Sequence, residues 1–326
     1  MEIGKVPENV LKRAVFKQIR KRRPEVILHP AVGEDCSAIA AKDDEMLVFS
    51  VDPITVATKQ DGMFAVHITA NDLASSGAEP VGIMTSILLP PGTREIRLRE
   101  LMQEMERACA LLQMEIIGGH TEISDAVNRP VVTVTGIGKV KKGELITTGG
   151  LKPGDELVMT KWAGIEGTAI IASQKREKLL ETLPEELVDE AASFREYLSV
   201  MPEAAVAKRV GVSAMHDVTE GGIFGALWEI GAAADTGITA DLMKIPIRQE
   251  TIEVCEVFDI NPYQMMSSGS LLIGCRQGNL LVEELNQAGI PAVVIGRATE
   301  TNDRIVRNGE DIRFLGPAGS DEIYKI

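Results

Sequence analysis

The sequence predicts an α/β protein of two domains, and three observations lead to this prediction. Through the first 140 residues, short runs of β-branched and apolar residues alternate with longer segments of helical periodicity. The segment 147–154 (Thr-Thr-Gly-Gly-Leu-Lys-Pro-Gly) is rich in turn formers, and a new strand-like run follows it. The length of 326 residues is sufficient for two domains with sizeable cores. We therefore expect an N-terminal domain over 1–148 and a C-terminal domain over 149–326.

The elements of the N-terminal domain follow from hydrophobic periodicity. Apolar residues at Val10, Leu11, Ala14 and Val15 fit one face of a helix that begins after Pro7. Short apolar runs that end at proline or glycine fit buried strands. We expect helices over 7–23, 62–76 and 94–113, and strands over 46–51, 81–89, 115–117 and 131–138.

The C-terminal domain shows the same alternation without an internal repeat of 20–50 residues. Its first strand follows the turn-rich segment, and a glycine pair precedes one of its helices. We expect strands over 156–160, 212–215, 270–275, 292–296 and 304–307, helices over 168–175, 223–234 and 279–288, and two polar helices within 176–209.

Acidic residues recur beside glycines and other small residues along two-thirds of the chain. Small neighbours allow a backbone to approach a ligand closely, and carboxylates suit a hard cation such as Mg²⁺. This pattern predicts a site for a nucleotide with Mg²⁺, and therefore phosphoryl chemistry. The segments are Gly33-Glu34-Asp35, Ser50-Val51-Asp52-Pro53, Asn71-Asp72-Leu73-Ala74, Gly118-Gly119-His120-Thr121-Glu122 and His216-Asp217-Val218-Thr219-Glu220-Gly221-Gly222.

Three of these acids are candidate cation ligands. Asp52 follows a predicted buried strand, and ligands of α/β proteins collect at the carboxyl ends of strands. Asp72 lies in a predicted helix among small residues, where a carboxylate without a partner would be costly. Asp35 and Asp52 are also common residue types in turns, and each taken alone fits that interpretation as well.

Both glycine pairs are candidate anion sites. The segment 118–122 is expected to form a loop after a strand, whose N–H groups accept a phosphate while Glu122 adds a cation ligand. The segment 216–222 precedes a helix, whose amide groups and dipole favour an anion. Glycine pairs also mark ordinary turns, and Thr219 can equally be a helix N-cap with Asp217 a turn residue.

Composition excludes several classes of protein. The formal charge of −14 argues against duplex binding, and the basic cluster 17–23 is either the solvated end of a helix or a phosphate contact. No run is long enough to span a membrane, and the N-terminus lacks the apolar stretch of a signal peptide. The four cysteines are scattered, which fits a reducing compartment. We expect a cytoplasmic protein without nucleic-acid or membrane partners. The cysteines are Cys36, Cys109, Cys255 and Cys275.

The common nucleotide-binding and hydrolase signatures are absent from the sequence. It contains no P-loop, no kinase-type catalytic loop and no Gly-x-Ser-x-Gly elbow. If the protein uses ATP, it therefore does so on a less common fold.

Taken together, the five acidic segments and 152–155 (Lys-Pro-Gly-Asp) resemble the aminoimidazole-ribonucleotide synthetase superfamily over residues 30–300. The resemblance implies an N-terminal α/β domain that dimerises through its sheet, and a C-terminal α+β domain. It also implies ATP and Mg²⁺ as cofactors, with Asp35, Asp52 and Asp72 as cation ligands. The shared chemistry is activation of an amide-like oxygen by ATP or transfer of the γ-phosphoryl group.

Departures from individual branches narrow this resemblance. Residues 1–32 lack the cysteine of selenophosphate synthetase, and 33–35 reads Gly-Glu-Asp where thiamine-monophosphate kinase shows Gly-Asp-Asp. The body, including 164–170, is most similar to the carbamoyl dehydratase of hydrogenase maturation. That branch carries a cysteine as its last residue, whereas this sequence ends in Ile326. The substrate, whether a small molecule or protein-borne, therefore stays unassigned.

The resulting hypothesis is a homodimeric, ATP- and Mg²⁺-dependent enzyme of this superfamily. A small-molecule kinase of the thiamine-monophosphate type is the alternative enzyme, and a non-catalytic nucleotide-binding scaffold for metallocentre assembly is the alternative outside the enzyme class. The resemblance implies catalytic roles for Asp72, His120 and Asp217, cofactor binding by Asn71, Gly118, Gly119, Thr121, His216, Gly221 and Gly222, and metal binding by Asp35, Asp52, Asp72 and Glu122.

Overall fold

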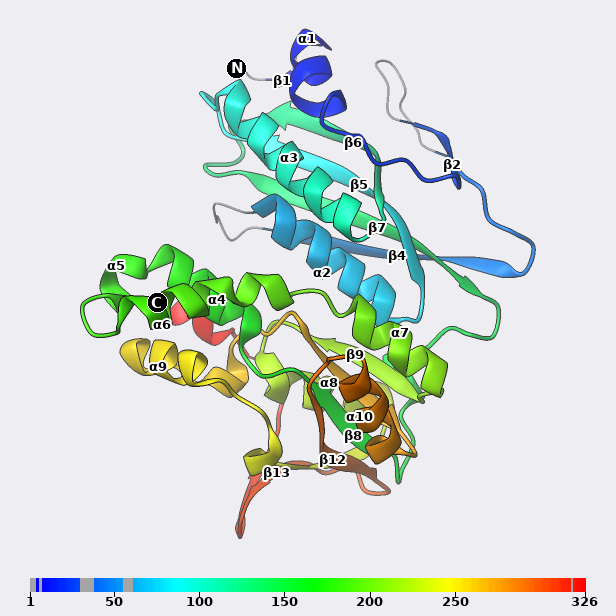
Figure 1. Cartoon of the computed structure of the whole chain (residues 1–326), viewed down its shortest axis with the longest axis vertical. Helices are drawn as coiled ribbons and strands as arrows, with labels where there is room; N and C mark the ends of the chain where they lie inside the picture. Colours follow the sequence, from blue (N-terminus) through cyan, green and yellow to red (C-terminus); the bar gives the residue numbers. More distant parts are fainter. Residues whose placement is uncertain (1–3, 6–7, 30–37, 55–60, 318) are drawn as a thin grey trace. The chain divides into compact units, whose positions relative to one another are not determined.

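The computed structural model describes residues 4–5, 8–29, 38–54, 61–317 and 319–326, and the chain divides into two compact units (Figure 1). Unit 1 comprises residues 1–73 and 78–145, and unit 2 comprises residues 74–77 and 146–326. Both contain sheets and helices, as the sequence predicts. Each unit is described separately below.

Unit 1 is built on a five-stranded sheet with the order β1-β6-β5-β7-β4. Only β5 and β6 are parallel, and the other neighbours in this sheet are antiparallel. Thr69 of α2 lies against Gly136 of β7, so this helix covers one face of the sheet, beside α3 (Figure 1). The strands are β1 (Gly4–Lys5), β4 (Glu45–Ile54), β5 (Glu79–Leu89), β6 (Glu115–Ile123) and β7 (Val131–Lys141), the helices are α2 (Asp61–Ser75) and α3 (Glu95–Leu111), and β2 (Val26–Leu28) pairs with β3 (Ala38–Ile39) in a separate ribbon.

Strand β4 continues beyond its predicted end at residue 51 and includes Asp52 and Pro53. It is an edge strand of the sheet, where the missing N–H of a proline leaves no ladder position unfilled. Its side chains alternate strictly in exposure. Ser50 and Asp52 are half-buried on the face that carries α2, whereas Phe49 and Val51 on the other face are 62% and 60% exposed.

The N-terminal helix is shorter than the predicted range 7–23. It consists of α1 (Glu8–Val10) and a π-helical segment (Leu11–Phe16). The backbone amides of Arg20 and Lys21 donate to the buried Glu106 at 2.9 and 2.6 Å, and that of Arg23 donates to buried Glu115 at 2.6 Å. These bonds replace the helical hydrogen bonds and hold the chain in an extended course.

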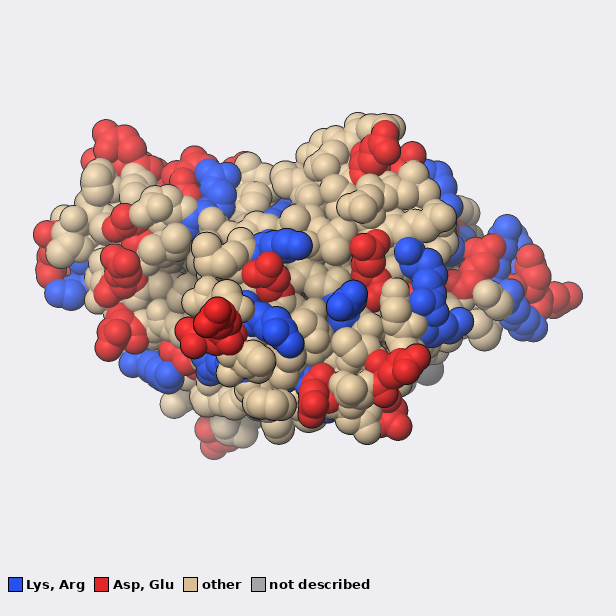
Figure 2. Space-filling model, turned by 90° about the horizontal axis from the view of Figure 1, so that it is seen from below, with Lys and Arg blue, Asp and Glu red and all other residues tan. Residues whose placement is uncertain are grey.

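Two arginines of the basic cluster 17–23 are paired with acids of unit 1. Arg22 contacts Glu115 at 2.8 Å, and Arg23 contacts Glu25 at 2.8 Å and Glu79 at 2.6 Å. The arginine contacts therefore serve to fasten this segment. The face shown in Figure 2 likewise displays lysine and arginine side chains interspersed with acidic ones.

Unit 2 contains a seven-stranded sheet with the order β14-β13-β10-β12-β8-β11-β9. The pair β10 and β13 is parallel, and the other neighbours are antiparallel. One core lies between the sheet and α8, and a second lies between the sheet and helices α7 and α10. The strands are β8 (Glu156–Thr160), β9 (Ala214–Val218), β10 (Gly237–Asp241), β11 (Ser270–Cys275), β12 (Ala292–Thr299), β13 (Arg304–Asn308) and β14 (Asp311–Phe314), and the helices are α4 (Ile165–Gln174), α5 (Arg176–Leu179), α6 (Glu185–Ser193), α7 (Met201–Val210), α8 (Gly222–Ala233), α9 (Gln249–Phe258) and α10 (Gly278–Gln287).

Several predictions for unit 2 need correction. The segment 176–209 forms α5, α6 and most of α7 with a 3₁₀ turn at Phe194–Tyr197, so two helices were too few. Strand β10 and helix α9 were not predicted. Strand β10 is short and is fixed by its neighbours β12 and β13, which are contacts that local periodicity does not reveal.

In the part of the chain that the structure covers, no helix combines the length and apolarity required to cross a membrane.

Candidate functional site

Asp52 and Asp72, predicted as cation ligands from separate elements, are brought together in unit 1. The Ser50 hydroxyl makes a short contact with Asp72 Oδ2 on α2 and lies 3.2 Å from Asp52 Oδ2 on its own strand. A hydroxyl carries a single proton and can donate to only one of them at a time. Two carboxylates therefore share one donor, and their combined negative charge favours a cation beside them.

Asn71 supports this group from within the fold. Its side chain is fully buried in α2, between Ala70 and Leu73, which are also fully buried. Asp72, its neighbour in sequence, is only half-buried. Burial suits Asn71 to the positioning of Asp72 more than to direct contact with a ligand.

The oxygen donors of Asp52, Asp72 and Ser50 fit Mg²⁺, which prefers carboxylate and hydroxyl oxygens and retains several waters. Among the residues that the structure describes, however, no group of three or more His, Cys, Asp or Glu side chains is arranged to hold a metal. Asp35, the third predicted ligand, lies outside the described residues, together with Gly33, Glu34 and Cys36.

The prediction of a loop at 118–122 is wrong, because these residues belong to β6, which pairs with β5 as far as Ile123. The register shifts by one residue near Gly118. Gly119 has φ 154°, and a Cβ there would lie 2.3 Å from the Thr85 carbonyl oxygen. Because Gly119 has no side chain, β5 can approach β6 closely, and the pairing of the two strands continues past the register shift.

His120 and Glu122 lie on the opposite face of the sheet from Asp52. Asp52 pairs with Val134, Val134 with Thr85, and Thr85 with Gly119, and directly paired residues share a face. Alternation then places His120 and Glu122 on the other face and Thr121 on the α2 face. His120 is exposed and lies 3.3 Å from Glu122. The structure therefore does not group Glu122 with Asp52 and Asp72.

His216 and Asp217 are part of β9, whereas the sequence placed them after a strand. His216 Nε2 lies 2.9 Å from Glu229 Oε2 of α8, and Nδ1 lies 3.5 Å from the Thr148 hydroxyl. The Asp217 side chain points to the opposite face of the sheet and is buried. Two adjacent residues of the motif thus have different surroundings.

The Gly221–Gly222 turn begins α8 and requires glycine. Gly222 has φ 61°, and a Cβ there would lie 2.7 Å from the carbonyl oxygens of Tyr263 and Met265. Gly221 is the N-cap of α8, and no side chain caps this helix, so the alternative role of Thr219 as a helix N-cap is excluded. The Gly221 N–H donates to Asp321 Oδ2 at 2.7 Å. A carboxylate of the same chain thus occupies the predicted anion site.

Glu166 and Asp321 are two site residues that sequence reasoning missed. Glu166 Oε2 accepts a hydrogen bond from Ser268 N at 3.4 Å, and burial, followed by the charges of Asp321 and Asp217, raises the pKa of Glu166 to about 7. Burial also raises the pKa of Asp321. Glu166 is followed by Gly167 and shows the same acid-beside-glycine signal, whereas Asp321 has no distinguishing local pattern.

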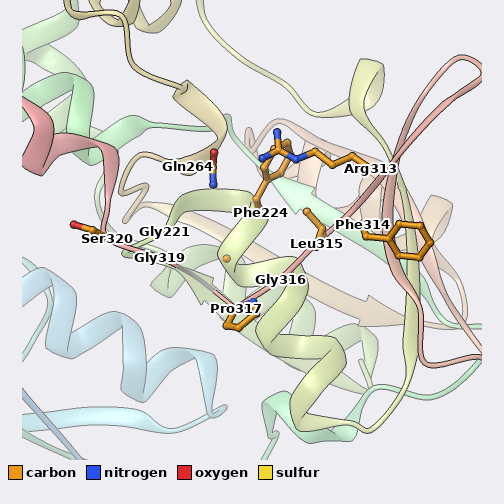
Figure 3. A pocket seen from close by; sticks show the side chains of 11 residues that line it. Gly221, Phe224, Gln264, Arg313, Phe314, Leu315, Gly316, Pro317, Gly319 and Ser320 are labelled. Carbon is orange, nitrogen blue, oxygen red and sulfur yellow. The ribbon is translucent and has the colours of Figure 1, made fainter.

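A pocket of about 80 Å³ lies at the start of α8 (Figure 3). The Phe224 ring stacks on Tyr263 with centroids 5.4 Å apart, and the Arg313 guanidinium lies 5.2 Å from the Phe224 centroid. Figure 3 shows Arg313 extending from its strand to Phe224. Gly221, Gln264 and Ser320 contribute to the wall. The pocket thus combines an aromatic face, a cation and the start of a helix.

The buried ion pair of Lys161 and Glu203 in unit 2 is structural. Lys161 is buried, pairs with Glu203 at 2.6 Å and donates to the carbonyls of Tyr197, Ser199 and Gly269 at 2.7–2.9 Å. Its donors are fully used within the protein, and none is left for a phosphate.

The cysteine thiols of the described residues are buried. Burial raises the pKa of Cys255 to about 12 and that of Cys275 to about 11, and it raises the pKa of Cys109 even further. Reactive cysteines need a low pKa and access to solvent. These three side chains therefore serve packing.

Fold and site together define a two-domain α/β protein with clustered carboxylates on a sheet face and a glycine turn at a helix start. The model of the AIR synthase related protein, N-terminal domain, matches residues 33–140, and that of the C-terminal domain matches residues 152–307. The chain belongs to the AIR synthase related family.

Its relatives include hydrogenase-maturation proteins. The chain is 25% identical over 312 residues to a putative hydrogenase expression/formation protein of Methanocaldococcus jannaschii, covering 93% of this chain and 90% of that one. It is 27% identical over 281 residues to carbamoyl dehydratase HypE of Rhodobacter capsulatus, covering 83% and 80%.

Solved structures with the same fold include E. coli HypE, with a TM-score of 0.83 at 20% identity over 98% of this chain and 99% of that one. A HypE crystallised in complex with ATP gives a TM-score of 0.76 at 17% identity over 97% and 95%. Thiamine-monophosphate kinase of Stenotrophomonas maltophilia gives 0.72 at 18% identity over 91% and 93%. At these low sequence identities, the structural similarity establishes a shared fold only.

Proposed function

We propose that the chain is an ATP- and Mg²⁺-dependent enzyme that activates a carbamoyl or amide oxygen, or transfers the γ-phosphoryl group, in a reaction similar to hydrogenase maturation. The observation that carries the proposal is the pairing of Asp52 and Asp72 around Ser50. The names of the relatives, carbamoyl dehydratase HypE and a HypE in complex with ATP, support the reaction class and the nucleotide.

In this proposal Asp52 and Asp72, together with Asp35, hold the cation. When bound, Mg²⁺ neutralises phosphate charge and so favours attack on phosphorus. Ser50 fixes the two described carboxylates relative to each other through its single hydroxyl proton, and buried Asn71 holds the position of Asp72 on α2. His120 and Glu122, on the opposite sheet face, are left out of this cation group.

The residues that bind the nucleotide or substrate in unit 2 are proposed without individual roles. Asp217, His216 and the Gly221–Gly222 turn are assigned to nucleotide or substrate binding in unit 2, on the strength of the family resemblance. A thiol acceptor, if the reaction uses one, is proposed to come from Cys36, which lies outside the described residues, or from another molecule, because Cys109, Cys255 and Cys275 are buried with raised pKa values. The relative solved as a HypE–HypF complex supports a protein-borne substrate.

We further propose a homodimer formed through the open face of the unit 1 sheet. Phe49 and Val51 expose 62% and 60% of their surface there, and Leu47 on the same face exposes 37%. Adjacent exposed apolar side chains of this kind mark association surfaces. Light scattering of Phe49→Glu is expected to give a monomer, with Leu111→Glu as control because Leu111 is an exposed apolar residue on α3. A dimeric Phe49→Glu variant contradicts this assignment.

The enzymatic proposal is tested by incubating the protein with ATP, Mg²⁺ and candidate substrates, including carbamoyl donors and thiamine monophosphate, while ADP, AMP and phosphate are followed. Mn²⁺ binding measured by electron paramagnetic resonance gives a readout independent of turnover. Asp72→Asn is compared with Asp125→Asn, an exposed acid of unit 1.

Product formation that is lost in Asp72→Asn and retained in Asp125→Asn supports the enzyme, and phosphoryl transfer to thiamine monophosphate assigns the kinase chemistry. If no candidate gives products and Asp72→Asn binds Mn²⁺ and nucleotide as the wild type does, the enzyme is excluded. Nucleotide binding without any turnover then assigns the scaffold function.

A further inference from the structure

The segment 321–326 is docked into unit 2 by its acidic residues. Asp321 is fully buried, and Glu322 and Ile323 are 6% and 8% exposed. Besides the bond from Gly221 N, Asp321 accepts one from Ile323 N at 3.0 Å, and Glu322 accepts one from Asn261 N at 3.2 Å. Polar side chains of a short 3₁₀ turn, Glu322–Lys325, are thus used as anchors.

Glu166 is tied to the same place through the segment 265–268. Gly167 N donates to the Met266 carbonyl at 3.0 Å, and Ser268 N donates to Glu166. Ser267 N donates to the Thr219 carbonyl at 3.3 Å, next to the turn that holds Asp321. One short segment therefore joins the start of α4 to the start of α8.

The groups that face Glu166 are mainly acidic. The negative charges of Asp321 in the docked segment and of Asp217 on β9 both raise the pKa of Glu166. Burial, followed by the charges of Glu220, Asp321 and Glu166, raises the pKa of Tyr324 in the same segment. Lys325 is engaged with Glu322 at 2.6 Å. Ionised Glu166 thus stands in a desolvated position beside two further carboxylates, which is unfavourable for all three.

We propose that the segment 321–326 is a proton-controlled plug of the Gly221–Gly222 turn, which docks most firmly while the Glu166 carboxyl is protonated and whose release frees the Gly221 amide for an anionic ligand. The statement that release frees the turn for an anionic ligand rests on the proposed function, which assigns this turn to a nucleotide or substrate. The statement that protonation of Glu166 favours docking of the segment is independent of the proposed function.

The direction of the pH dependence follows from the two states. Burial is the main cause that raises the pKa of Glu166 to about 7, and the charge of docked Asp321 adds to it, so that release removes one neighbouring charge. The docked state therefore binds the proton more tightly. Docking is therefore expected to weaken as the pH rises toward about 7 and to be level above this value.

Release of the plug also opens the pocket of about 80 Å³, because Gly319 and Ser320 form part of its wall. The Gly221 amide and the Arg313 guanidinium then lie along one cavity. Both are donors suited to a carboxylate or a phosphate group. The freed site thus selects for negative charge.

Hydrogen exchange monitored by mass spectrometry on the full chain, without nucleotide, tests the docking. Exchange of peptides covering 319–326 and 219–223 is followed from pH 5 to pH 8.5 and corrected for the intrinsic pH dependence of amide exchange. Protection of both is expected to fall together up to about pH 7 and then to level off. Glu166→Gln should keep both protected throughout, and exposed Glu310→Gln should behave as the wild type.

Protection that is independent of pH in the wild type, or that falls equally in Glu166→Gln, overturns the proposal. A peptide from α10 reports whether each variant is folded. Inorganic phosphate and ATP are then added at pH 7.5: increased exchange of 319–326 with greater protection of 219–223 supports the statement that release frees the turn for an anionic ligand, and unchanged exchange overturns it. Because docking is measured before any nucleotide is added, a lack of ATP turnover leaves that result intact.

Discussion

Two groups of carboxylates in this protein have opposite environments. Asp52 and Asp72 in unit 1 are half-buried and share the Ser50 hydroxyl, whereas Glu166 and Asp321 in unit 2 are almost fully buried. The negative charge of clustered, half-buried carboxylates attracts a cation. Buried ones instead hold a proton or accept backbone amides. We therefore propose that the same residue types serve cation binding in one unit and proton-dependent packing in the other.

The largest expected effect concerns Glu166, whose pKa is raised by burial to about 7 from its ordinary value of 4.5. The native state binds this proton more tightly than the unfolded state, so stability falls as the pH rises from about 4.5 to about 7 and is constant above. The difference of about 2.5 pH units corresponds to roughly 3 kcal/mol. Glu166→Gln should match the wild type near pH 5 and exceed it by up to about 3 kcal/mol at pH 7.5 in urea denaturation. Equal stabilities at pH 7.5 would show that Glu166 is not desolvated.

Asp72→Asn tests the other group. Loss of one of two clustered charges is expected to weaken Mn²⁺ binding by about 100-fold, or roughly 2.7 kcal/mol, and to reduce ATP turnover to a similar degree. Stability should stay within about 1 kcal/mol, because Asp72 is half-buried and its repulsion with Asp52 is relieved. A large loss of stability with unchanged Mn²⁺ affinity would instead make Asp72 a packing residue.

These two residues also show how far sequence reasoning reaches. The pairing of Asp52 with Asp72 could be predicted, because each acid stands in a local pattern that fixes its element. The continuation of β6 through Gly118 could not, since it depends on the approach of Thr85 from another strand. Asp321 was missed because it meets Gly221 from 100 residues away, and no local pattern encodes such a contact.

Ser50→Ala probes whether the shared hydroxyl organises the carboxylates. Its removal leaves both charges in place and removes only their common donor, so we expect a loss of about tenfold in Mn²⁺ affinity, as for other residues that orient metal ligands. Ser86→Ala, on the opposite face of the sheet, provides the matched control. Equal affinities for Ser50→Ala and wild type would mean that the two carboxylates are positioned by their backbones alone.

The smallest effect is expected at the pair of His216 on β9 and Glu229 on α8, which lies near solvent. Glu229 exposes 39% of its side chain and His216 20%, and exposed pairs of this kind contribute about 0–1 kcal/mol. Glu229→Gln retains a hydrogen-bond acceptor for His216 and should change the free energy of unfolding by less than about 0.5 kcal/mol at pH 7. Urea denaturation of Glu229→Gln and Glu166→Gln under the same conditions compares the two positions directly, since each variant replaces one glutamate by glutamine. If Glu229→Gln instead lowers the free energy of unfolding by several kcal/mol, the difference in burial between Glu229 and Glu166 does not decide how much each acid affects stability.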